Sequence, residues 1–114
     1  MKYLIVKPQD KKNTKDLGYI KVQQLLNQED VENLSAAIIE IDGTNKKIIN
    51  RKGDAIYYIL EGNGYFEING IKNAVEKGDL VFIPKGCEYF DSGKLKMICI
   101  NSPRYDSNFI KYVD

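Results

Sequence analysis

The side chains that perform most acid–base and nucleophilic chemistry are scarce in this chain. Its 114 residues include no histidine and only two cysteines, Cys87 and Cys99. A cysteine becomes a nucleophile when a neighbouring base helps to form the thiolate, so Cys99 is interpreted as a buried, inert thiol. Glu61, Asp79 and Asp91 are a possible set of acid–base carboxylates. Glu61 and Asp79 also adjoin glycine turns, where a solvated or turn-capping role is the simpler interpretation.

Composition excludes several classes of function. The charges nearly cancel, with 17 basic and 16 acidic residues, and the lysines are scattered. This balance argues against binding to nucleic acid or to a membrane surface through a strong net field. The cysteines fit no zinc spacing and are too few for a disulfide framework, which predicts reduced thiols in the cytoplasm. The apolar run within Met1–Val6 is too short for a signal peptide or a membrane span.

Length and rhythm predict a single all-β domain over residues 1–114. β-Branched and aromatic residues dominate, and turn residues recur at the spacing of a sandwich or barrel. Only Gln28–Leu34 is compatible with a helical turn. Ser102–Asp114 is predicted to lie over the body, anchored by Phe109, Tyr112 and Val113. The predicted strands are Lys2–Val6, Tyr19–Leu26, Leu34–Ile41, Lys47–Arg51, Ala55–Glu61, Gly64–Ile68, Lys72–Glu76, Leu80–Ile83, Glu88–Phe90 and Lys94–Asn101.

Alternation within the strands predicts which side chains point inward. In Lys94–Asn101 the lysines must reach water, so Leu95, Met97 and Cys99 are predicted to face the interior. Ala55–Glu61 is apolar or aromatic on both faces, which predicts a strand covered on both sides. Asn69-Gly70 is the strongest turn signal, because both residues tolerate a positive φ in a two-residue hairpin.

Two runs resemble the conserved motifs of the cupin superfamily, and of its small, single-domain, cupin-2-like members. Asp54–Gly64 resembles the first motif and Gly78–Gly86 the second, with the Asn69-Gly70 hairpin between them. The resemblance covers roughly residues 36–104. It implies an all-β double-stranded β-helix, a jelly-roll barrel of two antiparallel sheets. It also implies a homodimer, since cupins commonly pair through their sheets or by exchanging N-terminal strands.

The positions at which cupins hold a metal carry other residues here. Gly43 and Gly62 fit the ends of the first motif, and Tyr89 takes the histidine position of the second. With a three-residue spacer the other ligand positions fall on Ile49, Arg51 and Ala55. With a four-residue spacer the two histidine positions are Ile48 and Asn50 instead. Neither set supplies the converging imidazole, thiolate or carboxylate donors of a transition-metal site, so no metal and no other cofactor is predicted.

Five residues are the candidates for a ligand-binding site, and no catalytic residue is assigned. Arg51 would bind a carboxylate or phosphate, unless Arg51 points outward on a solvated turn. Tyr57 and Tyr89 would offer rings and hydroxyls to a ligand, or else form plain barrel core. Asn50 would hydrogen-bond a ligand or cap a turn. Met97 would give an adaptable apolar wall.

Three classes of function remain open. The first is a metal-free barrel that binds a small anionic or hydroxyl-rich metabolite without turnover. The second is a metal-independent enzyme, similar to sugar epimerases or isomerases, that uses tyrosine and a carboxylate from Glu88, Asp54 or Asp91. The third is a structural or interaction protein whose barrel is filled by side chains. The volume and polarity of the barrel cavity distinguish the three classes.

Overall fold

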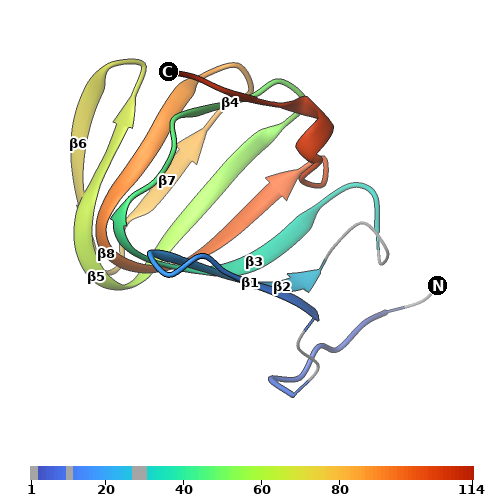
Figure 1. Ribbon diagram of the computed structural model, residues 1–114. Helices are drawn as coiled ribbons and strands as arrows, with labels where there is room; N and C mark the ends of the chain where they lie inside the picture. Colours follow the sequence, from blue (N-terminus) through green and yellow to red (C-terminus); the bar gives the residue numbers. More distant parts are fainter. Residues whose placement is uncertain (1–2, 10–11, 27–30) are drawn as a thin grey trace.

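Strands form nearly all the regular structure of this protein. The computed structural model describes residues 3–9, 12–26 and 31–114 (Figure 1). A single 3₁₀ turn, η1, covers Ser107–Phe109. The all-β prediction is therefore confirmed. The strands are β1 (Lys12–Asp16), β2 (Ile20–Leu26), β3 (Ser35–Thr44), β4 (Ile48–Asn50), β5 (Asp54–Ile68), β6 (Ile71–Glu76), β7 (Leu80–Ile83), β8 (Glu88–Ser102) and β9 (Ile110–Tyr112).

Two long antiparallel strands, β5 and β8, hold the fold together. They pair from Asp54↔Ser102 to Ile68↔Tyr89. The N-terminal half of β5 and the C-terminal half of β8 lie in one layer with β7, β3, β2 and β1. The C-terminal half of β5 and the N-terminal half of β8 lie in a second layer with β6, β4 and β9. Every pairing is antiparallel, and the sheet curls on itself into a barrel, as Figure 1 shows. This architecture confirms the predicted jelly-roll barrel.

Glycines allow β5 and β8 to bend from one layer into the other. Gly62 has φ +89°, and a Cβ there would collide with the carbonyl oxygen of Lys94. Gly93 has φ +126°, and a Cβ there would lie 2.6 Å from Cα of Gly64. Both the positive φ and the close backbone approach therefore require glycine at this crossing. Because the chain bends here without breaking, the predicted strands Ala55–Glu61 and Gly64–Ile68 are both parts of β5. In the same way, Glu88–Phe90 and Lys94–Asn101 are both parts of β8.

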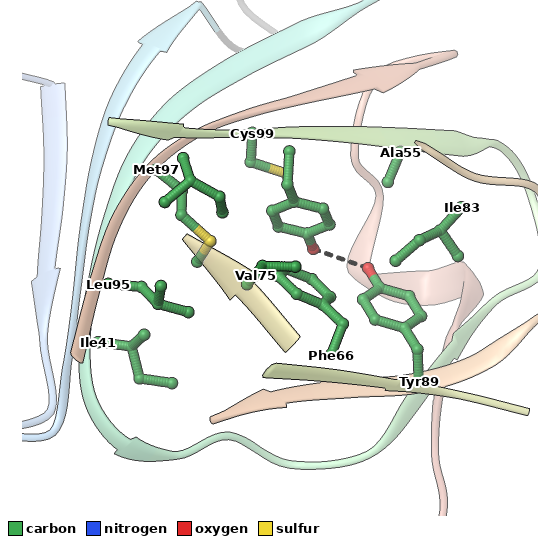
Figure 2. Close-up of a cluster of buried hydrophobic side chains, with 11 residues drawn as sticks. Ile41, Ala55, Phe66, Val75, Ile83, Tyr89, Leu95, Met97 and Cys99 are labelled. Carbon is green, nitrogen blue, oxygen red and sulfur yellow. Dashed lines mark hydrogen bonds between the residues drawn. The ribbon is translucent and has the colours of Figure 1, made fainter. Parts of the chain in front are cut away.

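The core lies between the two layers and follows the predicted alternation. Leu95, Met97 and Cys99 of β8 are all buried, as expected. Figure 2 shows these side chains meeting Ile41, Phe66 and Val75 inside the barrel. β5 is buried on its inner face, which carries Tyr57, whereas Tyr58 on the outer face is 42% exposed, so the predicted cover on both sides is not found within the single chain. Burial of these apolar side chains stabilises the barrel by about 1.5–3 kcal/mol for each large one.

The two ends of the chain differ from the prediction. Residues 3–6 of the predicted first strand form no strand, and Tyr3 is 84% exposed, while Lys2 lies outside the described residues. The edge strand is β1 instead, whose polar sequence gave no alternation to detect. In the tail, β9 pairs with β4, and the buried anchor is Ile110. Phe109 and Tyr112, predicted as anchors, are exposed, and Val113 is half-buried, because the tail is held by Ile110 and by the β4–β9 pairing instead.

Helical structure is confined to η1 within the described residues. The predicted turn over Gln28–Leu34 is not helical at residues 31–34, and residues 28–30 lie outside the described part of the chain. In residues 3–9, 12–26 and 31–114, no helix has the length and apolar character needed to cross a membrane.

Candidate ligand-binding site

A cavity of about 490 Å³ lies within the barrel and extends toward β2 and the C-terminal tail. Its wall is formed by residues of β1, β2, β3, β4, β5 and β8, by the β1–β2 and β3–β4 connections, and by Tyr105, Ser107 and Tyr112 of the tail. This volume is in the range of pockets that hold small molecules, ~300–1,000 Å³. The barrel is therefore not filled by its own side chains.

A pair of tyrosines forms the aromatic part of the wall. Tyr57 on β5 and Tyr89 on β8 point toward each other, and their hydroxyl oxygens are 2.7 Å apart (Figure 2). Burial, followed by the nearby Cys99, raises the pKa of both phenols, so both stay protonated at neutral pH. One hydroxyl donates to the other, and the second hydroxyl proton can be donated to the sulfur of Cys99 or to a ligand. The pair can therefore donate a hydrogen bond to a ligand oxygen.

Asn50 performs the turn-capping role that the sequence left open, and its ligand-binding role stays a prediction. Its Oδ1 accepts hydrogen bonds from the backbone N–H groups of Lys52, at 3.0 Å, and Gly53, at 3.1 Å, which caps the turn after β4. Asn50 also lines the cavity. Its Nδ2 donates to Oδ1 of Asn101 at 3.5 Å, and Nδ2 of Asn101 donates to Sγ of Cys99 at 3.4 Å.

Cys99 is a protonated thiol within this polar row. Burial raises its pKa to about 12, against smaller opposing effects of hydrogen bonds with Tyr57 and Asn101. A thiol with such a pKa supplies almost no thiolate at neutral pH. The inert role predicted for Cys99 is therefore consistent with its surroundings.

Among the described residues, Asp91 is the only carboxylate that lines the cavity. Its side chain is 3% exposed, and Oδ1 accepts a hydrogen bond from Nδ2 of Asn45 at 3.3 Å. Oδ2 is buried and has no hydrogen-bond partner among the described residues. Burial raises the pKa of Asp91 to about 6, and the hydrogen bonds from Asn45 and from its own backbone oppose this rise. Asp91 is therefore a proton acceptor and hydrogen-bonding group whose capacity the protein leaves partly unused.

Two of the five predicted site residues lie elsewhere. Arg51 is exposed on the bend after β4, where its backbone N–H donates to the carbonyl oxygen of Phe109 at 3.0 Å. The turn that Asn50 caps directs Arg51 outward, so its charge is outside the cavity. Met97 is fully buried in the core and is not part of the cavity wall. Tyr57, Tyr89 and Asn50 do line the cavity.

The structure also decides the register of the first motif. Ile48 and Asn50 line the cavity, whereas Ile49 and Arg51 do not. This alternation corresponds to the four-residue spacer, in which the resemblance placed Ile48 and Asn50 at the histidine positions. Within the described residues, no three histidine, cysteine, aspartate or glutamate side chains converge to hold a metal. Asp91 and the protonated thiol of Cys99 do not fit a transition-metal centre.

Glu61, Asp79 and Asp91 were the predicted acid–base carboxylates, and of these three only Asp91 lines the cavity. A signal was present, because Asp91 follows Tyr89 by two positions on a strand and shares its inner face. Asn101 was missed because a lone asparagine near a strand end is usually a turn residue. Its partners come from β4 and from its own strand, and only the folded barrel brings them together.

The structure defines the class of protein as a cupin barrel. The chain is similar to the cupin domain of Schizosaccharomyces pombe Cnp3, with a TM-score of 0.71 and 15% identity over 84% of this chain and 70% of that chain. It is also similar to Pac13, described as a unique nucleoside dehydratase, with a TM-score of 0.87 and 15% identity over 99% of this chain and 92% of that chain. Streptomyces Pac13 has been solved with uridine in variants that replace a tyrosine with phenylalanine or a histidine with glutamine. The likeness at this identity shows the fold.

Residues 5–104 match the family model of the ethanolamine utilisation protein EutQ, so the chain belongs to the EutQ family. A protein of Aquifex aeolicus (strain VF5), itself uncharacterised, is 24% identical over 111 residues, which cover 90% of this chain and 92% of that protein. The cupin resemblance predicted from the two glycine-rich motifs is confirmed.

Proposed function

We propose that the cavity binds a small, hydroxyl-rich metabolite, of the size of a nucleoside or a sugar, without a metal. The observation that carries this proposal is a cavity of about 490 Å³ that contains both the Tyr57–Tyr89 hydroxyl pair and the partly unpaired carboxylate of Asp91. A hydroxyl group both donates and accepts, so it can satisfy the carboxylate and the phenol together. An anionic ligand is no longer favoured, because Arg51 is outside and the buried charged group of the wall is the acid Asp91, while Lys15 and Lys46 of the wall are exposed.

The likeness to Pac13 supports the choice of ligand size and class. Pac13 is a barrel of the same fold that has been solved with uridine, which carries a ring and several sugar hydroxyls. Tyr19, Phe90 and Tyr105 in the cavity wall offer further aromatic surface for a ring. The chain has no histidine, so any histidine-dependent step of a relative has no counterpart here.

Titration with uridine and with D-glucose tests this proposal, with binding measured by the change in the protein's amide NMR chemical shifts. Residues of the cavity wall are expected to shift, and Tyr89→Phe is expected to weaken binding about tenfold, because the ligand loses a hydrogen bond in a buried site. Arg51→Ala serves as the control and is expected to bind like the original protein. Shifts confined to the outer surface, or equal loss in both variants, would contradict a site in the cavity.

A metal-independent enzyme is the second candidate, and Asp91 favours it. A buried carboxylate whose pKa is about 6 is suited to proton transfer near neutral pH. If this protein moves a proton to and from carbon, sugars or nucleosides incubated with it in deuterated water will exchange a carbon-bound hydrogen. Exchange that disappears in Asp91→Asn supports the enzyme, and the absence of exchange favours binding alone.

A homodimer that packs through the outer face of the barrel is part of the proposal. Four apolar side chains lie on the outer face of the barrel and are 37–60% exposed. They are Leu80 and Phe82 of β7, Tyr58 of β5 and Ile100 of β8. Strand pairing places them side by side, since Tyr58 is opposite Leu80, and Ile56 is opposite both Phe82 and Ile100. A contiguous exposed apolar face on this scale usually marks an interface. Light scattering is expected to give twice the 13.0 kDa chain mass, and a monomer at micromolar concentration contradicts the dimer.

We also propose a cytoplasmic location, because Cys87 and Cys99 are both free thiols. Thiol labelling of protein extracted from its own cells under acid quench tests this location. Two reactive thiols per denatured chain are expected, and a disulfide between copies contradicts it.

A further inference from the structure

We propose that Asp91 selects the ligand by charge, so that the cavity prefers a hydroxylated ligand carrying a protonated amine, as in an amino sugar or an amino alcohol, over neutral and anionic counterparts. This inference rests on the proposed function, because it names the class of ligand for the same cavity. It replaces the anionic ligand considered from the sequence, since Arg51 takes the outward of its two predicted orientations and an acid lies inside.

The first support is the unsatisfied geometry of Asp91. The carboxylate is on the inner face of β8, 3% exposed, and only Oδ1 has a side-chain hydrogen bond. The carbonyl oxygen of Asp91 is held by the backbone N–H of Asn45 at 2.9 Å, which fixes the residue at the end of the β3–β4 connection. Oδ2 has no partner within the described residues, and a buried carboxylate oxygen without a partner costs free energy. A donor group on a ligand relieves that cost.

The second support is the charge of the groups that face Asp91. The groups around Asp91 are all neutral: Asn45 from the β3–β4 connection, Phe66 and Tyr57 from β5, and Tyr89 two positions before it on β8. Cys99 is neutral as well, because its thiol stays protonated. The surroundings of Asp91 therefore supply dipoles and aromatic surface, and none of these groups compensates a negative charge.

Two lysines line the cavity, and neither balances Asp91. Nζ of Lys46 lies over the ring of Tyr112, 5.6 Å from its centre, and Lys15 is exposed on β1. The pKa of Asp91 is set by burial, by Asn45 and by its own backbone, with no contribution from a cation. Within the described part of the chain, its ionised form is therefore left without a counter-charge.

An ammonium group on the ligand supplies what this site lacks. A charge-assisted hydrogen bond to a buried carboxylate is shorter and stronger than one between neutral groups. A ligand carboxylate or phosphate at the same place would face repulsion from ionised Asp91. The second hydroxyl proton of the Tyr57–Tyr89 pair can be donated to a ligand hydroxyl in place of the Cys99 sulfur, so the site fits an amine and a hydroxyl on one small molecule.

Three probes with the same three-carbon skeleton isolate the charge. These are 3-amino-1,2-propanediol, glycerol and glycerate, which are cationic, neutral and anionic at neutral pH. Amide chemical-shift titrations at about pH 7.5 are expected to show the amine binding about tenfold more tightly than glycerol, and glycerate most weakly. The preference is expected to vanish in Asp91→Asn. It is also expected to fade in the unaltered protein as the pH falls through about 6, where Asp91 becomes protonated.

The outcomes separate this inference from the proposed function. If the three probes bind equally, or glycerate binds best, the charge selection is wrong, while binding of hydroxyl-rich molecules stands. If neither these probes nor uridine and D-glucose shift the cavity residues, the binding function itself fails and the inference fails with it. The pH titration of the unaltered protein decides the question even if Asp91→Asn does not fold.

Discussion

Replacing Asp91 with asparagine removes one buried charge and keeps the shape of the side chain. In the folded protein the pKa of Asp91 is raised to about 6, mainly by burial, from an ordinary value of 3.8. The folded state therefore binds a proton more tightly than the unfolded chain, and ionisation of Asp91 destabilises the fold. Below about pH 4 Asp91 is protonated in both states and costs nothing, and above about pH 6 the full cost is present.

The size of this cost follows from the two pKa values. Their difference corresponds to ~3 kcal/mol, at 1.36 kcal/mol for each tenfold change in proton affinity. The asparagine carries no charge, so it does not incur this cost at any pH. Its Oδ1 can still accept from Asn45, but its N–H donors find no partner, which adds a constant penalty of about 1 kcal/mol. Asp91→Asn is therefore expected to stabilise the protein by ~2 kcal/mol at about pH 7.5.

Urea unfolding of both proteins at a series of pH values from about 4 to 8 measures this effect. The difference in unfolding free energy between variant and original is expected to rise by ~2.5 kcal/mol across this range, independently of the constant penalty. Asp106→Asn is the matched control, because hydrogen bonding to the Asn108 backbone lowers the pKa of Asp106 and the sign of its contribution reverses. A difference that stays flat with pH, or a variant that is less stable at about pH 7.5, would refute the reasoning about Asp91.

Three further predictions follow from the same structure. Tyr57→Phe and Tyr89→Phe each leave one buried hydroxyl without its 2.7 Å partner, so each is expected to lower the free energy of unfolding by ~1–3 kcal/mol in urea. The double variant is expected to lose less than the sum of the two, and additive losses would contradict the hydrogen-bonded pair. Gly62→Ala is expected to cost several kcal/mol more than Gly70→Ala, because a Cβ at Gly62 meets the Lys94 carbonyl while a Cβ at Gly70 meets nothing within 4 Å, although both have positive φ; similar melting temperatures would count against the glycine crossing. Iodoacetamide is expected to spare Cys99 in the folded protein and to modify it once urea unfolds the chain, because its thiol is buried with a pKa of about 12; rapid labelling of Cys99 in the folded state would overturn its description as inert.

Part of the site followed from local pattern alone. Tyr57 and Tyr89 were chosen because one lies within the first cupin motif and the other at a ligand position of the second, and both prove to line the cavity. Asn50 was recognised for two roles, and it performs the capping role while lining the cavity. Such predictions succeed because a strand alternates its side chains with a period of two, so the motif fixes which residues share a face.

Other parts depended on one residue of register. Arg51 was placed inside by a three-residue spacer and lies outside, because a shift of one position moves a side chain to the other face of the strand. Asp91 shares a face with Tyr89, but its importance came from burial and from an oxygen without a partner. Neither property is encoded by neighbouring residues in the sequence, since both depend on what the β3–β4 connection and β5 bring against β8.

The sequence by itself determined the barrel, because strand alternation, turn residues and glycine spacing act over a few residues and all specify the same fold. It also determined that imidazole chemistry is absent, since the chain has no histidine. The tertiary structure decided the sign of the charge in the cavity, and with it the class of ligand that we propose. Charge inside a protein depends on which side chains are buried together, and residues such as Asn45, Tyr57 and Asp91 meet only when the long strands β5 and β8 fold across the barrel.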